Sequence, residues 1–219
     1  MSQRSRAHRA ARRSATRWWL VGGVAAAIVL AAAIAVVAGS GSGSGDGSEQ
    51  AGIEQTRPVT VTGTALPVLP DSGADPAIGL TAPKLSGESF DATPVVVAPG
   101  TQPTLLVFLA HWCPHCRREL PKLVEWEKGG GVPAGVDVVG VATATDPAAP
   151  NYPPSEWLAD AGWPWPVMAD SDASTAAQAM GLPSYPYFVL LKADGSVALR
   201  LTGEVDTAEL TQQIEAALA

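Results

Sequence analysis

Cysteine and histidine are scarce in this sequence, which limits the kinds of site that it can build. The 219 residues include two cysteines, Cys113 and Cys116, and three histidines, of which only His8 lies far from that pair. A structural zinc site takes four ligands, and two of them often come from a distant segment. Because the chain has no second group of such ligands, we expect no structural zinc site and no resident metal.

Acidic side chains are absent before residue 46, and basic ones are few after it. All 21 Asp and Glu lie from Asp46 onward, whereas six of the 14 Lys and Arg precede residue 18. The chain from residue 46 onward therefore has eight basic side chains and a formal charge of −13. Such a surface repels phosphate groups, so the composition argues against nucleic acid as a partner.

Charge is also absent from residues 18–38, which read WWLVGGVAAAIVLAAAIAVVA. A helix of this length spans roughly 30 Å, the thickness of the hydrocarbon core of a membrane. The two tryptophans at its start and the basic tail of residues 1–17 predict a single-pass anchor in the cell membrane, with a cytoplasmic N-terminus and an extracytoplasmic remainder. A cleaved signal peptide, with Val36 and Ala38 at the cleavage site, is the alternative, and it would release the protein. The pair Arg12-Arg13 allows a twin-arginine signal as a third reading.

The rest of the chain divides into an expected linker and one expected domain. Residues 39–79 begin with GSGSGSGDGS and are rich in Pro, Gly and Thr, so we predict a flexible extracytoplasmic tether. Within residues 80–219, continuous apolar runs alternate with helical patterns and end in a hairpin and a helix. This order predicts an α/β domain with a mixed central sheet that has helices on both faces. The expected strands lie at 103–110, 136–143 and on both sides of Asp194-Gly195, and the expected helices at 116–128, 154–162, 172–181 and 206–219.

The two cysteines lie where a buried strand is expected to end and a helix to begin. A disulfide between Cys113 and Cys116 closes a ring of four residues, for which chain entropy provides only about 2 kcal/mol of stability. This small gain argues against a purely structural role. At a helix N-terminus, unpaired N–H groups and the helix dipole favour the reactive thiolate. Pro114 fits the first helical turn because it has no N–H group to leave unsatisfied. The position therefore favours a redox-active pair.

The segment FLAHWCPHCRRELP resembles the active site of membrane-anchored thioredoxin-like proteins of the TlpA/ResA kind. The resemblance extends over residues 80–219 and includes VVGVAT, GLPSYPYFVLLKADG and a final Gly before the last helix. It implies a thioredoxin fold and thiol-disulfide exchange with protein partners outside the cytoplasm. By this resemblance, Cys113 would act as the nucleophile and Cys116 as the resolving thiol. The two cysteines would form a reversible disulfide, and no cofactor would be needed.

Four further site residues follow from the same resemblance. Pro186 matches the family's cis-proline opposite the disulfide, with Pro183 as the alternative for that position. Tyr185 before it would offer backbone groups to a bound substrate peptide. Glu119 matches an acid that takes up a proton near the thiols, although a solvated helix position is an equal alternative. Trp112 is expected to pack beside the active site and shield it.

Two positions depart from related proteins and leave the direction of electron flow open. Thioredoxin has an acid at the position of Val107, so a proton acceptor here would be Glu119 or water. The dipeptide Pro-His between the cysteines is typical of oxidising DsbA-type proteins rather than of reductive TlpA-like members. His115 at this place stabilises the thiolate, which makes the disulfide easier to reduce. We therefore expect a potential more oxidising than that of thioredoxin. The partners would be exported proteins, such as apocytochrome c, and a membrane redox partner.

Metal delivery is the main alternative function. His111, Cys113, His115 and Cys116 form the sequence HWCPHC, and thiolates with imidazoles suit copper(I). Such a copper-binding metallochaperone would require the four side chains to converge, which a strand-to-helix junction need not allow.

Two further hypotheses are weaker. The segment TAPKLSGESF resembles a hairpin found in thiol peroxidases, but we find no Thr- and Arg-lined pocket for a peroxidatic cysteine. Trp157, Trp163 and Trp165 would form a binding surface if exposed, although packing against the core is the favoured interpretation.

Overall fold

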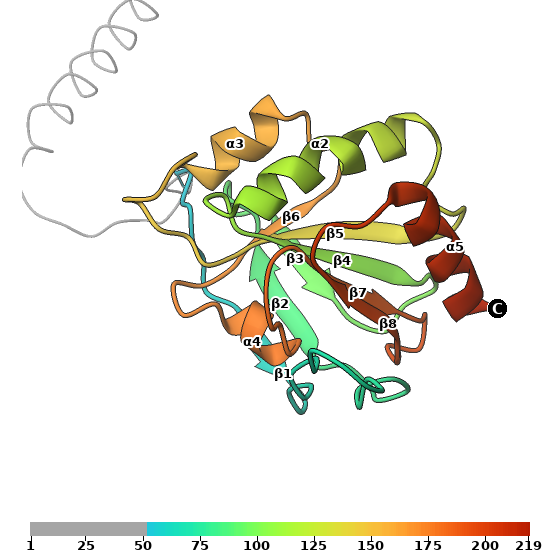
Figure 1. Ribbon diagram of the computed structural model, residues 1–219. Helices are drawn as coiled ribbons and strands as arrows, with labels where there is room; N and C mark the ends of the chain where they lie inside the picture. The colour runs from blue at the N-terminus through green and yellow to red at the C-terminus, as the bar shows by residue number, and fades with distance from the viewer. Residues whose placement is uncertain (1–51) are drawn as a thin grey trace, which may run out of the picture. The chain divides into compact units, whose positions relative to one another are not determined.

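The computed structural model describes residues 52–219, which form two sheets and four helices (Figure 1). The strands are β1 (Thr60–Thr62), β2 (Lys84–Glu88), β3 (Pro94–Val97), β4 (Thr104–Leu109), β5 (Asp137–Ala142), β6 (Val167–Ala169), β7 (Tyr187–Leu191) and β8 (Val197–Thr202). The helices are α2 (Pro114–Lys128), α3 (Pro154–Asp160), α4 (Thr175–Ala179) and α5 (Thr207–Leu218).

The central sheet is mixed, as the sequence predicts. Its strand order is β6-β5-β4-β7-β8, in which β4 runs parallel to β5 and antiparallel to β7. The hairpin β7–β8 forms around Asp194-Gly195, the turn signal in the sequence. The first three strands make a separate antiparallel sheet in the order β1-β2-β3.

Strand β4 is buried on both of its faces, which explains its unbroken apolar sequence. Leu105, Val107 and Leu109 pack into a core with side chains of α2, α3 and α5. Leu106 and Phe108 pack into a second core with α4 and the three-stranded sheet. Figure 1 shows α2 and α5 on one side of the sheet and α4 with β1 and β2 on the other. Helices thus cover both faces, and the strand holds the active-site segment on a rigid base.

The expected boundary at residue 80 is wrong for the described part of the predicted linker. Residues 52–79 pack along the domain: β1 pairs with β2, and Leu66 is 5% exposed and bonds Ala179 O through its N–H at 2.9 Å. Asp75 forms an ion pair with buried Arg200. A segment without periodicity can still fold when the domain itself supplies partners for its backbone and side chains.

The predicted membrane anchor at 18–38, the tail at 1–17 and residues 39–51 lie outside the described residues, so these predictions stand untested. Between residues 52 and 219, no helix combines the length and the apolar character that a membrane crossing requires.

Candidate active site

The turn from β4 to α2 places both cysteines at one end of the central sheet. Cys113 is the N-cap residue of the 15-residue helix α2, and Pro114 is its first residue. The N–H group of Cys113 donates to Ala110 O at 3.0 Å, and its carbonyl accepts from Arg117 N at 3.1 Å. The helix therefore begins at the first cysteine, as the sequence predicts, and that cysteine lies at the end of the helix where N–H groups are left unpaired.

The two thiols have different surroundings. Cys113 is 6% exposed and its Sγ lies 3.8 Å from Tyr185 O, whereas Cys116 is fully buried. Burial raises the pKa of Cys116, and the charges of Cys113 and Glu119 add to this, although the Ala110 N–H donates to its Sγ at 3.5 Å. The two sulfurs are not bonded to each other in this structure, and the disulfide between them stays a prediction. Only Cys113 is placed to meet a partner first.

The peptide bond between Tyr185 and Pro186 is cis, the conformation expected from the sequence. It brings Tyr185 O next to Cys113 Sγ just before β7 begins. The ring of Trp112 meets that of Tyr185 edge-on at 5.9 Å, and its Nε1 donates to Ala144 O at 2.7 Å. The three predicted residues thus surround Cys113, while their part in substrate binding stays a prediction. A second cis bond, Tyr152–Pro153, was not foreseen.

Glu119 is a buried carboxylate one helical turn after Cys116. Its side chain is 0% exposed, Oε1 accepts from Val205 N at 3.2 Å, and Oε2 accepts from Lys122 Nζ at 3.2 Å. Burial raises the pKa of Glu119 above its usual value, although both hydrogen bonds oppose the change. Residues three apart lie on one helix face, so Glu119 lies on the same face of α2 as Cys116, and its role as a proton acceptor stays a prediction. The alternative of a solvated helix residue is wrong.

Sequence reasoning missed an ion-pair cluster beside the cysteines. Glu204, in the loop between β8 and α5, accepts from Arg118 Nε at 2.9 Å and from Lys122 Nζ at 3.2 Å. His115 Nδ1 also lies 2.9 Å from Glu204, so the imidazole bonds this carboxylate rather than a thiol. These bonds lower the pKa of Glu204 to about 2, with those from Arg118 having the largest effect. Its only signal in the sequence is its place before the last helix, which does not reveal its partners.

His111 does not join the cysteines in a metal site. Its Nδ1 lies 2.7 Å from Pro150 O, and its Nε2 accepts from Asp146 N at 3.2 Å, so both ring nitrogens are occupied. The imidazole of His115 is directed to Glu204. The convergence that a copper site needs is therefore not present, and residues 52–219 contain no cluster of three or more His, Cys, Asp or Glu arranged to hold a metal ion.

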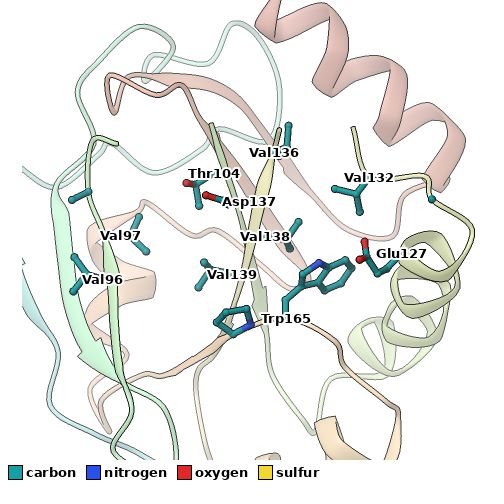
Figure 2. A pocket seen from close by; sticks show the side chains of 13 residues that line it. Val96, Val97, Thr104, Glu127, Val132, Val136, Asp137, Val138, Val139 and Trp165 are labelled. Atoms are coloured by element: carbon teal, nitrogen blue, oxygen red, sulfur yellow. The ribbon is translucent and has the colours of Figure 1, made fainter. Parts of the chain in front are cut away.

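A cavity of about 580 Å³ lies at the opposite end of the central sheet (Figure 2). Thr104 and Asp137, which begin the parallel strands β4 and β5, line it together with Val96 and Trp165. The cysteines follow the last residue of β4, so this cavity is separate from the thiols.

The tryptophans near this cavity pack against the protein rather than forming an open surface. Trp165 meets Trp163 at 4.8 Å and Trp126 at 6.3 Å. Trp157, Trp163 and Trp165 are all half-buried against the core that contains α2. Packing is therefore the correct interpretation of this cluster.

Comparisons with known proteins agree with this fold. The family model described as Redoxin matches residues 76–218. A thiol:disulfide interchange protein of the thioredoxin family from Chlorobium tepidum has 24% identity and a TM-score of 0.52, with 68% of this chain and 100% of that chain covered. StoA from Bacillus subtilis has 17% identity and a TM-score of 0.51, covering 63% of this chain and 98% of its own. A candidate DsbE from Chlorobium tepidum has 25% identity and a TM-score of 0.52, covering 65% and 98%.

Proposed function

Because this chain belongs to the Redoxin family and is a thioredoxin-like thiol-disulfide oxidoreductase, we propose that it exchanges disulfides with exported proteins through Cys113 and Cys116. The observation that carries the proposal is the asymmetric thiol pair at the start of α2. Cys113 lies at the helix N-terminus opposite a cis-proline, and Cys116 is buried one turn further on. This asymmetry suits a nucleophile and a resolving thiol.

The exchange proceeds in two balanced steps. The Cys113 thiolate attacks one sulfur of a partner disulfide, so the partner's S–S bond breaks, a mixed disulfide forms and one partner thiolate leaves. Cys116 then gives its proton to Glu119 and attacks Cys113 Sγ, which releases the second partner thiolate. The partner is reduced by two electrons and the Cys113–Cys116 disulfide forms. The reverse sequence oxidises a partner dithiol.

The location and the partners belong to the proposal as well. The predicted anchor at 18–38 would hold the domain outside the cytoplasm, as the resemblance to TlpA/ResA-type proteins implies. There it would meet exported proteins, apocytochrome c among them, and a membrane redox partner that restores its starting state. The Pro-His dipeptide supports a potential more oxidising than that of thioredoxin.

Trapping with Cys116→Ser tests the proposed exchange. This variant keeps the nucleophile but lacks the resolving thiol, so mixed disulfides at Cys113 should accumulate and survive gel electrophoresis without reductant. Cys113→Ser is the matched control and should trap at least about tenfold less, since the remaining thiol is buried. Equal trapping by both variants, or none by either from membranes, would contradict the proposal.

A further inference from the structure

Three basic side chains of α2 meet at the single carboxylate of Glu204. Arg118 approaches Oε1 with Nη2 at 2.7 Å and Nε at 2.9 Å, and His115 Nδ1 lies 2.9 Å from the same oxygen. Lys122 Nζ lies 3.2 Å from Oε2. Arg118 Nη2 also lies 2.9 Å from His115 Nδ1, so the guanidinium, the imidazole and the carboxylate form one compact group.

The basic members of this group lie on the first turns of α2, which begins at Cys113, and Lys122 also contacts Glu119, the predicted proton acceptor. The hydrogen bonds that Arg118 donates to Glu204 are the main cause that raises the pKa of Arg118, and the nearby charge of Cys113 adds to it. Lys122 bonds Glu119 Oε2 as well as Glu204, at 3.2 Å in each case. Glu204 therefore competes with the Cys113 thiolate for Arg118 and with Glu119 for Lys122.

We propose that Glu204 is a positioning residue that sets the redox equilibrium of the cysteine pair by drawing the cations of α2 away from the Cys113 thiolate. A thiolate is stabilised by nearby positive charge. A more stable thiolate makes the disulfide easier to reduce and the protein a stronger oxidant. By pairing with Arg118 and Lys122 and adding its own negative charge, Glu204 makes the cysteine pair less oxidising than the Pro-His dipeptide alone predicts.

The redox equilibrium of the full chain with glutathione tests this inference. The disulfide reacts with two glutathione thiols, its S–S bond breaks, the protein dithiol forms and one oxidised glutathione is released. Cys113 and Cys116 are the only cysteines in the chain, so alkylation of the free thiols reports this site alone. In Glu204→Gln, the equilibrium constant should shift toward the dithiol roughly three- to tenfold, and concentrated salt should reduce the shift.

Two further variants make the result specific. Arg118→Gln removes a cation and should shift the equilibrium toward the disulfide, and in that background Glu204→Gln should have a smaller effect. Glu125→Gln removes the same charge from α2, but Glu125 pairs with Lys128 and is 72% exposed. The equilibrium constant of Glu125→Gln should lie within about twofold of that of the unchanged protein.

The inference rests on the proposed exchange function, and the two can fail separately. If the unchanged protein does not equilibrate with glutathione, the exchange function itself fails. If it equilibrates but Glu204→Gln has the same constant, or one shifted toward the disulfide, only the role of Glu204 is overturned. A lower melting temperature of Glu204→Gln with an unchanged equilibrium constant would show a merely structural carboxylate and would also overturn it.

Discussion

At the scale of single residues, burial separates groups that have similar chemistry. Cys113 and Cys116 are both thiols, yet only Cys113 lies against the cis-proline loop while Cys116 is enclosed. Glu119 and Glu204 are both carboxylates of one ion-pair network, yet burial raises the pKa of Glu119 and its basic neighbours lower that of Glu204. These differences suit Glu119 to carry a proton and Glu204 to stay ionised.

Glu119→Gln is expected to slow the resolution of mixed disulfides by about ten- to hundredfold, since no carboxylate would then accept the proton of Cys116. Burial holds the pKa of Glu119 above its usual value, so the carboxylate form, which accepts the proton, predominates only at a pH above this raised pKa. In the unchanged protein, the rate of resolution should therefore increase as the pH rises through this raised pKa. In Glu119→Gln, this increase should be absent. Single-turnover kinetics with a fluorescent peptide disulfide, between about pH 4 and 8, measure both effects.

The control for this prediction is Glu127→Gln, on the same helix but at the far cavity. It should leave the rate and its pH profile unchanged. A pH profile of Glu119→Gln that matches the unchanged protein would show that water accepts the proton instead.

At the scale of elements, the turn after α4 depends on one glycine. Gly181 has φ +71°, and a Cβ built there would lie 2.3 Å from Pro67 O and 2.8 Å from Arg200 Nη1. A side chain at position 181 would therefore clash with Pro67, so only glycine lets residues 66–69 lie close against this turn. This contact holds residues 66–69 of the domain against the turn that leads to the loop facing Cys113.

Gly181→Ala should lower the free energy of unfolding by more than the roughly 1–3 kcal/mol that a left-handed backbone alone costs. The excess comes from the contact with Pro67, which must move aside. Gly162→Ala is the matched control, because Gly162 has φ +75° after α3 and nothing within 4 Å of its Cβ position. Urea unfolding of both variants gives the comparison. Equal losses in the free energy of unfolding would mean that the segment around Pro67 moves aside without a measurable cost.

At the scale of the whole molecule, a buried ion pair joins the segment 52–79 to the central sheet. Arg200 of β8 is 0% exposed at its side chain and bonds both oxygens of Asp75. It also donates to Pro67 O at 2.8 Å and to the hydroxyl of Tyr187 at 3.1 Å. Burial raises the pKa of Asp75, but the bonds and charge of Arg200 together with the bond from Ala77 N outweigh burial and hold that pKa below its usual value. The folded unit therefore includes residues that composition alone places in a tether.

Asp75→Ala is expected to cost about 3–5 kcal/mol of stability, because it leaves the charge of Arg200 buried without its partner. Urea unfolding monitored by tryptophan fluorescence measures the loss. Asp71→Ala, at an exposed position four residues earlier, should change stability by less than about 0.5 kcal/mol. Similar values for the two variants would place residues 66–77 outside the cooperative unit.

The sequence by itself determined the cysteine pair, the strand before it and the helix after it. These features could be predicted because each is local: an apolar run, a helix start and a Cys-Pro-His-Cys motif lie within about 20 residues. The cis-proline lies far from the cysteines along the chain, and only the resemblance placed it at Pro186. Only the tertiary structure decided that Glu204 gathers His115, Arg118 and Lys122, and that Asp75 meets Arg200. Those partners lie 82 to 125 residues apart in the chain. Such contacts depend on how strands and loops come together in space. The sequence around a charged loop residue does not indicate which distant residue it will contact.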